Sequence, residues 1–253
     1  MARVCVLGLG YIGLPTSLLF AQSNTVTGVD INEKVVSELR CGRLPFDEKG
    51  ISELFNNVKD NFHPNSIIKE SDIFVICVPT PLDETLKVSD LKFVRSAAGM
   101  IASVIKEGNI VILESTVPPG TSEKIVIPIL EQSGIPFGAF EYAHCPERAI
   151  PGNTLHEMIH NDRIIGVKNE ETAKRVEKLY RSFVKGEIYH STIRAAEFVK
   201  LMENTYRDVN IALANEFALL ANETGINIWD CINLANKHPR VNILKPGPEY
   251  YHR

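Results

Sequence analysis

The chain has 253 residues, of which 44% are hydrophobic and 23% charged, and this ordinary globular composition predicts one large or two modest domains. Its net charge of −4 argues against a nucleic-acid partner. No apolar run approaches the ~20 residues of a membrane span, and a first strand starting at Arg3 leaves no room for a signal peptide. The five cysteines are scattered without close pairs, so we expect a cytoplasmic location and no metal ligation.

Up to about residue 190, short apolar runs alternate with segments of helical spacing. The apolar runs predict strands at 3–8, 25–30, 72–79, 109–116, 139–144 and 163–167. Helices are predicted between them, at 11–22, 31–40, 91–106, 122–132 and 170–184. Strands that alternate with helices imply right-handed crossovers, so the fold class is α/β with a doubly wound, mostly parallel sheet of Rossmann type.

The first strand leads into "GLGYIG", which contains Gly8, Gly10 and Gly13 and precedes a helix. In a dinucleotide site the first glycine makes the turn, the second admits the pyrophosphate, and the third lets helix and strand pack closely. Asp30 closes the second strand 17 positions after Gly13, where a carboxylate accepts ribose hydroxyls and repels a 2′-phosphate. We therefore predict NAD rather than NADP, bound by a domain spanning residues 1–189.

Two further turns follow buried strands and carry hydroxyl groups. "VPTP" (78–81) contains Thr80, and "ESTVPPGT" (114–121) contains Ser115 and Thr116. Each turn alone could simply cap the segment that follows it. Because parallel strands end at one sheet edge, where open α/β sheets bind ligands, we favour a shared cleft.

The loop "CPERAIPGN" (145–153) holds a Glu-Arg pair between prolines. Glu147 could orient a water or accept a proton, and Arg148 could bind an anionic substrate. A surface ion pair between the two is an equally good interpretation of this loop by itself.

Residues 194–224 contain no Gly or Pro and carry an apolar stripe, which predicts one helix of about 30 residues capped by Gly225. We assign 190–253 to a central helical dimerisation region. Lys200, Asn204 and Asp208 form one polar line on this helix, with Arg207 beside it. Lys200 and Asn204 could donate hydrogen bonds to one developing alkoxide, although a solvated face is the common explanation of such a line.

Several motifs occur in a fixed order: "GLGYIGLPT", "VPTP", "ESTVPPGT", "CPERAIPGN", "NDRIIG", "EFVKLMENTYRDVNIALANE" and "HPRVNILKPGP". Together they resemble the UDP-glucose/GDP-mannose dehydrogenase family of NAD-dependent nucleotide-sugar 6-dehydrogenases. Within it, the "CPER", "NDRIIG" and "YRDVNIA" stretches are most similar to members that oxidise UDP-N-acetyl-D-mannosamine. The resemblance implies oxidation of the sugar C6 alcohol to a uronic acid, with two NAD reduced, for the synthesis of surface polysaccharide precursors.

The resemblance also implies roles for individual residues. Lys200 and Asn204 match residues that stabilise the C6 oxygen, and Glu147 and Thr116 match residues that organise a water or proton relay. Arg240, in "HPR", matches an arginine that reaches a neighbouring subunit's substrate site. The apolar faces of the long helix should be partly exposed, so we expect a homodimer through this helix. The NAD positions are Gly8, Gly10, Tyr11, Ile12, Gly13, Asp30, Thr80 and Thr116, and the substrate positions are Arg148, Lys200, Asn204, Arg207 and Arg240.

The chain departs from the family pattern after Pro248. The family continues towards a nucleophilic cysteine, a catalytic aspartate and a UDP-binding domain, whereas Glu249 to Arg253 match none of these. We therefore expect an inactive or incomplete piece of the enzyme, and Cys145 is a poor replacement nucleophile. Two alternatives stay open: a non-catalytic NAD-binding module that assembles with another chain, and a β-hydroxyacid-type dehydrogenase that transfers a single hydride without a cysteine.

Overall fold

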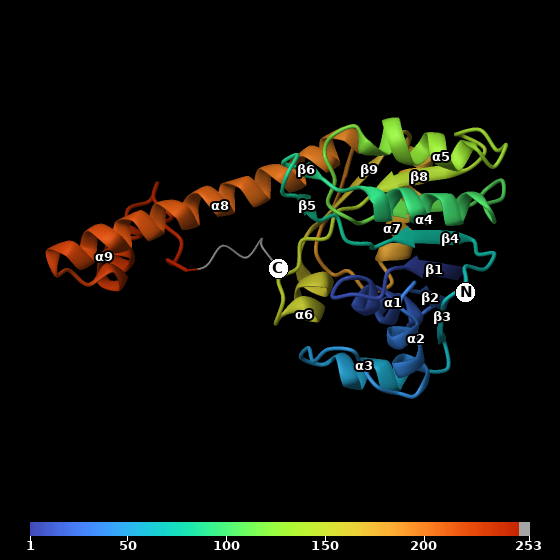
Figure 1. The fold of residues 1–253 in the computed structure, drawn as a ribbon, viewed down its shortest axis with the longest axis horizontal. Coiled ribbons are helices and arrows are strands. Elements are labelled where there is room, and N and C mark those ends of the chain that lie inside the picture. The colour runs from blue at the N-terminus through green and yellow to red at the C-terminus, as the bar shows by residue number, and fades with distance from the viewer. Residues whose placement is uncertain (248–253) are drawn as a thin grey trace. The chain divides into compact units, whose positions relative to one another are not determined.

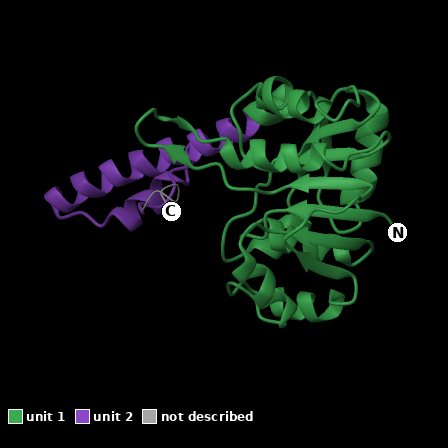
Figure 2. Cartoon of the chain, turned by 45° about the vertical axis from the view of Figure 1, so that its right-hand side comes forward, with its two compact units in different colours: residues 1–198 green, residues 199–253 purple. Residues whose placement is uncertain are grey.

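The computed structural model describes residues 1–247. It divides into two compact units, residues 1–198 and residues 199–253, which Figure 2 shows in different colours. The division falls inside the long helix α8 (Ile193–Thr224). The assignment of a nucleotide-binding domain to 1–189 and a dimerisation region to 190–253 stays a prediction.

Unit 1 is built on an eight-stranded sheet in which all neighbouring strands are parallel except β8 and β9. In spatial order the strands are β10 (Ile188–Ser191), β9 (Arg163–Val167), β8 (Glu141–His144), β7 (Ile110–Leu113), β4 (Ile73–Ile76), β1 (Arg3–Leu7), β2 (Thr25–Val29) and β3 (Phe62–Asn65). The chain winds outward from β1 to β3 and then crosses to β4 on the other side of β1. The predicted doubly wound, mostly parallel sheet is confirmed, and its switch point lies between β1 and β4.

Helices cover both faces of this sheet (Figure 1). On one face lie α1 (Gly13–Ala21), α3 (Ile51–Val58), α6 (Thr154–His160) and α7 (Glu170–Tyr180). On the other lie α4 (Lys92–Ala102), a π-helical turn η1 (Ser122–Val126) and α5 (Ile127–Glu131). Within β1, Val4 and Val6 contribute to the first core and Cys5 and Leu7 to the second, because successive side chains of a strand point to opposite faces.

Apart from α8, the observed helices are shorter than the predicted ones, and two of the differences have a clear cause. Helix α2 (Glu33–Arg40) begins two residues later than predicted, because the Asn32 side chain accepts a hydrogen bond from the Lys34 N–H and caps it. The single helix predicted over 122–132 is split into η1 and α5. Pro128 has no N–H to donate to the carbonyl four residues earlier, which explains the irregular turn before it. A short hairpin, β5 (Leu82–Asp83) with β6 (Val88–Ser89), follows the first of the two hydroxyl-bearing turns.

Unit 2 contains the rest of α8, the short helix α9 (Ile228–Ala235) and the loop that follows it. Gly225 ends α8 with a φ of +70°, as a left-handed helix cap requires. The loop is fixed by two asparagines: Asn236 exchanges two hydrogen bonds with the backbone of Ile243, and Asn215 exchanges two with that of Gly247. The expectations that concern Pro248 and the residues after it lie outside the described residues.

Among residues 1–247, no helix has both the length and the hydrophobicity that a bilayer-spanning segment requires. Within the same range, no three His, Cys, Asp or Glu side chains are close enough together to hold a metal ion.

Candidate nucleotide and substrate site

The turn between β1 and α1 is shaped by its glycines. Gly8 has a φ of +93°, which L side chains rarely adopt. A Cβ atom on Gly13 would lie 1.8 Å from the Gly8 carbonyl oxygen, so helix and strand approach as closely as their backbones allow. A Cβ on Gly10 would meet nothing within 4 Å. Gly8 and Gly13 are thus required by the fold, whereas Gly10 leaves open space in front of the helix N-terminus.

Asp30 is held against this turn by backbone groups. Its Oδ2 accepts the Leu9 N–H at 2.8 Å, and its Oδ1 accepts the Asn32 N–H at 2.8 Å. Ionised carboxylate oxygens have further lone pairs, so the side chain can still accept ribose hydroxyls. Tyr11 is exposed and stacks on Phe46 with ring centroids 4.4 Å apart. Ile12 directly precedes α1. The open glycine turn and the fixed carboxylate fit NAD.

The two hydroxyl-bearing turns are joined to each other. The Thr80 hydroxyl donates a hydrogen bond to the Thr116 carbonyl at 2.8 Å, and the Ser115 hydroxyl donates one to the Val78 carbonyl at 2.6 Å. Their strands, β4 and β7, are parallel neighbours. The predicted meeting of these turns at one sheet edge is confirmed, since the hydroxyls bond across it rather than within their own segments.

A buried cluster of charges lies at the same edge. Arg163, the first residue of β9, is 4% exposed and donates hydrogen bonds to Glu147 Oε2 at 2.5 Å and Glu114 Oε1 at 3.3 Å. Glu147 Oε1 also accepts the backbone N–H groups of Arg148 and Ala149. The interpretation of Glu147 and Arg148 as a surface ion pair is wrong for Glu147, because this carboxylate is buried against Arg163.

Glu114 collects three further donors besides Arg163. Its Oε1 accepts the Tyr180 hydroxyl at 2.6 Å, and its Oε2 accepts the Thr16 hydroxyl at 3.1 Å and the Cys77 thiol at 3.2 Å. Thr16 belongs to α1, so the cluster extends beneath the helix that starts at the glycine turn.

The pKa values of the two carboxyl groups are shifted in opposite directions. Burial raises the pKa of Glu114, and the attraction of Arg163 only partly offsets it. Burial also opposes ionisation of Glu147, but Arg163 and the N–H groups of Arg148 and Ala149 outweigh it and hold the pKa of Glu147 below its ordinary value. Glu147 is therefore an ionised carboxylate, suited to orienting a donor.

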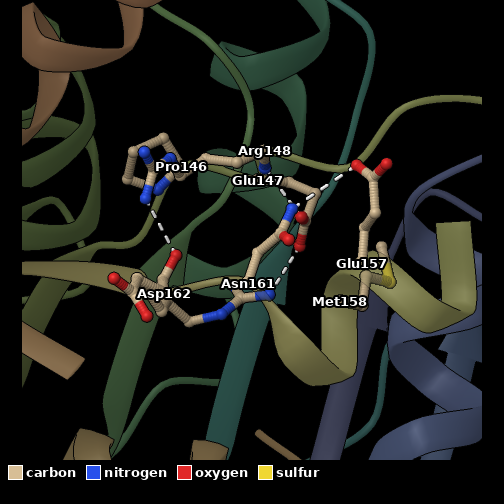
Figure 3. A pocket seen from close by; sticks show the side chains of 8 residues that line it. Pro146, Glu147, Arg148, Glu157, Met158, Asn161 and Asp162 are labelled. Carbon is tan, nitrogen blue, oxygen red and sulfur yellow. Dashed lines mark hydrogen bonds and ion pairs between the residues drawn. The ribbon is translucent and has the colours of Figure 1, made fainter. Parts of the chain in front are cut away.

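A small pocket, partly open to solvent, adjoins this cluster. It is lined by Pro146, Glu147, Arg148, Glu157, Met158, Asn161, Asp162 and Arg163 (Figure 3). The Arg148 guanidinium donates a hydrogen bond to the Asp162 carbonyl at 2.9 Å across the pocket wall. The pocket thus brings together the "CPER" loop and the residues around "NDR".

The remaining predicted residues belong to unit 2. Lys200 and Asn204 lie one turn apart on α8, and Arg207 donates a hydrogen bond to the Asn204 side-chain oxygen at 3.1 Å. Arg240 is exposed in the turn after α9, where its backbone N–H bonds to His238.

Comparison with known protein families shows where this chain belongs. The family model described as "UDP-glucose/GDP-mannose dehydrogenase family, NAD binding domain" matches residues 2–184, and the model of the central domain of the same family matches residues 194–251. This chain belongs to the UDP-glucose/GDP-mannose dehydrogenase family. Residues 2–184 are its NAD-binding domain, as the glycine turn and Asp30 predict.

Individual members of this family are similar to the chain over almost all of its length. The chain is 47% identical over 252 residues to the UDP-N-acetyl-D-mannosamine dehydrogenase of Methanococcus maripaludis, covering 97% of the chain and 57% of that protein. The structure of UDP-N-acetyl-D-mannosamine dehydrogenase from Pyrococcus horikoshii superimposes with a TM-score of 0.92 at 46% identity, covering 97% of this chain and 60% of that one. The chain thus spans less than two thirds of the length of these family members.

Another solved structure shares only the fold with this chain. The 3-hydroxyisobutyrate dehydrogenase of Mycobacterium tuberculosis has a TM-score of 0.68 at 18% identity, which shows a shared fold alone.

Sequence reasoning missed three parts of the site: Arg163, Glu114 and Tyr180. The "NDRIIG" motif contained a signal, since a charged residue opening a buried strand needs a buried partner.

Proposed function

We propose that this chain is the NAD-binding and central part of an enzyme that oxidises UDP-N-acetyl-D-mannosamine at C6 to the uronic acid, for surface polysaccharide precursors. The observation that carries the cofactor is the glycine turn with Asp30 fixed at its edge. The names and 46–47% identities of the relatives support the substrate. NAD accepts hydride when bound. Gly8, Gly10, Tyr11, Ile12 and Gly13 hold its pyrophosphate side, Asp30 its ribose, and Thr80 and Thr116 line the adjoining edge.

In this proposal, the residues that the family resemblance names hold and activate the substrate. Lys200 and Asn204 donate hydrogen bonds to the C6 oxygen as charge develops on it, and Arg207 orients Asn204. Arg148 and Arg240 bind anionic parts of the nucleotide sugar. Glu147 accepts a hydrogen bond from a water near Thr116 and orients it towards the reacting carbon.

The aldehyde produced by the first hydride transfer needs a thiol. None of the five cysteines matches the position of the family's nucleophile, and the two exposed ones, Cys41 and Cys231, lie outside the site motifs. Cys145 is fully buried, and burial raises the pKa of its thiol. Burial and the Glu114 carboxylate likewise raise the pKa of Cys77. Cys5 is buried, and burial raises its pKa to about 12. We therefore propose that this stretch binds NAD but does not complete the oxidation with its own cysteines. All five are free, which suits the proposed cytoplasmic location.

Calorimetric titration with NAD and NADP tests the cofactor. We expect NAD to bind at least about 100-fold more tightly than NADP, because Asp30 repels the 2′-phosphate, and Asp30→Ala to reduce this preference. Equal affinities in the wild-type chain would refute the proposal.

NADH release on adding UDP-N-acetyl-D-mannosamine, UDP-N-acetylglucosamine or small 3-hydroxy acids tests the reaction. We expect at most traces of NADH. Two NADH per UDP-sugar would contradict the argument from the cysteines. One NADH from a 3-hydroxy acid would favour a β-hydroxyacid dehydrogenase, and co-purification with a second chain that supplies the thiol would favour an assembly module.

The proposed assembly is a homodimer through α8. Apolar side chains along this helix are exposed in the single chain, namely Phe198, Met202, Tyr206, Val209, Leu213, Phe217 and Leu220. Their spacing of three and four residues forms one stripe, and such stripes usually mark an interface. Light scattering should give twice the chain mass, and the double variant Met202→Glu/Val209→Glu should give the mass of one chain. A monodisperse wild-type monomer at high concentration would contradict the dimer.

A further inference from the structure

Arg163 comes from the "NDRIIG" stretch and has no role in the proposed reaction so far. It opens β9, which runs antiparallel to β8 with Ala143 opposite Val167 and His144 opposite Gly166. Continuing this register by three residues puts Arg163 opposite Glu147. Because an antiparallel strand begins where its neighbours end, the Arg163 side chain starts at the edge where β7 and β8 deliver Glu114 and Glu147.

The guanidinium of Arg163 is fixed from two directions. Glu114 binds one of its nitrogens at 3.3 Å, and the ring of Tyr180 lies 4.4 Å from its central carbon. The Tyr180 hydroxyl in turn donates to Glu114 at 2.6 Å. All three side chains are buried. A planar guanidinium that is stacked and paired in this way has one orientation, which a lysine ammonium would not reproduce.

The Glu147 carboxylate is fixed by three donors as a result. Arg163 holds Oε2 at 2.5 Å, and the N–H groups of Arg148 and Ala149 hold Oε1 at 2.7 and 2.9 Å. An ionised carboxylate offers about four lone-pair positions. The structure thus commits three of them within the protein and leaves one. Glu147 also lines the adjoining pocket (Figure 3), from which an O–H donor can approach it.

We propose that Arg163 is a positioning residue: clamped by Glu114 and Tyr180, it sets the Glu147 carboxylate in the one orientation in which its remaining lone pair accepts a water. This inference rests on the proposed function only for the purpose of that water. Three ionisable groups act on the Glu147 carboxylate: Arg163 at the start of β9, Glu114 directly after β7 and Cys77 directly after β4. The charged side chains that line the adjoining pocket with it are Arg148, Glu157 and Asp162. Arg163 donates its guanidinium directly to Glu147 Oε2, whereas the Arg148 guanidinium donates to the Asp162 carbonyl, so we expect the orientation to depend on Arg163.

Carbon-13 NMR of the side-chain carboxyls, assigned with Glu147→Gln and Glu114→Gln, measures the titration of Glu147 in the 253-residue chain. In Arg163→Met we expect its midpoint to rise by more than about one pH unit. Arg163→Lys keeps a cation and should restore most of the low midpoint. A midpoint in Arg163→Met within about 0.3 units of the wild-type value would overturn the proposal.

Nitrogen-15 NMR of the guanidinium groups reads the clamp itself. In the wild type we expect separate Nη signals for Arg163, because its rotation is blocked, and averaged signals in Glu114→Gln. This variant keeps the guanidinium and so gives a result even where Arg163→Met is too unstable to study. Rapid rotation of the wild-type Arg163 guanidinium would also overturn the proposal.

A matched control is Arg175, which pairs with Glu141 at 2.5 Å on the neighbouring helix but is 43% exposed at its side chain. Arg175→Met should leave the Glu147 midpoint unchanged, and a shift as large as that in Arg163→Met would show that the effect is unspecific. The two proposals fail separately. A wild-type chain that does not bind NAD refutes the proposed function and leaves the NMR result standing, whereas a freely rotating Arg163 in a chain that binds NAD refutes only this inference.

Discussion

The glycine turn and the buried charge cluster lie at the same edge of the sheet, but the turn is formed by backbone and the cluster by side chains. The turn is made of backbone, with Gly13 packed so closely on Gly8 that a Cβ atom would lie 1.8 Å from a carbonyl oxygen. The cluster is made of long side chains, in which Glu114, Arg163 and Glu147 meet from three different strands or their ends.

This difference decides what each region tolerates. The turn depends on close backbone packing, so a side chain added at Gly8 or Gly13 acts through steric overlap. The cluster depends on charge balance, since two carboxylates share one guanidinium. Removal of one partner from a buried ion pair leaves an uncompensated charge and typically costs about 3–5 kcal/mol. Substitutions that separate sterics from charge therefore test the comparison.

Gly13→Ala should have the largest effect. Because its Cβ would overlap the Gly8 carbonyl, strand and helix must separate, and we expect a loss of about 3 kcal/mol or more in unfolding free energy. Urea unfolding at pH 7 measures it. An unchanged stability would show that the close packing of α1 on β1 is not required.

Gly10→Ala is the matched control, because its Cβ meets nothing within 4 Å. We expect a stability within about 0.5 kcal/mol of the wild type, as at open surface sites. NAD affinity, measured by calorimetry, should still fall at least about tenfold, because the added methyl occupies the space that the pyrophosphate needs. Wild-type affinity in this variant would remove Gly10 from the nucleotide site.

The same contrast explains what the sequence could predict of the site. The glycine turn is local: Gly8, Gly10 and Gly13 lie within six residues, and Asp30 closes the next strand. Arg163 is 16 residues from Glu147 and 49 from Glu114 in the chain, and they meet only through the register of β8 and β9. Local reasoning offered Arg148, the adjacent residue, as the partner of Glu147, and the antiparallel strand supplies another.

The fold shows a similar limit. Buried parallel strands are runs of apolar residues, so β1, β2, β4, β7, β8 and β9 were predictable. Strands β3 and β10 lie at the sheet edges and are partly exposed, so they lack that signal. Helix α6 follows a loop rich in Pro and Gly, and the buried Glu48 carboxylate accepts the N–H groups of Gly152 and Thr154 at its start. That contact spans more than 100 residues, so no local pattern reveals it.

Glu197 should give the next largest effect and extends the comparison to a single buried charge. Its carboxylate is fully buried and accepts the N–H groups of Gly120 at 2.5 Å and Ser122 at 2.8 Å, which fixes the start of η1. Glu197→Ala should cost about 2–3 kcal/mol of unfolding free energy, because two buried N–H groups lose their acceptor. Urea unfolding measures it. In the control Glu197→Gln, one bond persists and about half of the loss should remain; equal stability of all three proteins would contradict this role.

His144 tests a buried titratable group that lacks the partners of the cluster. Its ring is fully buried, neither ring nitrogen has a hydrogen-bond partner among the described residues, and burial lowers its pKa to about 3. The unfolded state therefore takes up a proton near the ordinary pKa of about 6.5 while the folded state does not, so stability is present above that pH and is lost as pH falls.

His144→Leu removes this proton uptake. At pH 7.5 we expect the variant and the wild type to have nearly the same unfolding free energy. Between pH 7.5 and pH 5 the wild type should lose about 2 kcal/mol more unfolding free energy than the variant does. Urea unfolding at several pH values measures the trend. A stability difference that does not change with pH would show that His144 is not held neutral.

Thr80→Val should give the smallest effect, because it removes a single hydrogen bond. That bond joins a side-chain hydroxyl to a backbone carbonyl. The half-buried Thr80 hydroxyl donates to the Thr116 carbonyl at 2.8 Å and joins the turns after β4 and β7. Loss of one such bond costs about 1 kcal/mol, and valine keeps the shape. Thr80→Ser retains the hydroxyl and should match the wild type in urea unfolding. Thr80→Val could lose much more unfolding free energy than this while Thr80→Ser loses none. The sheet edge would then depend on side-chain hydrogen bonds as strongly as the charge cluster does, which would contradict the contrast between the two regions.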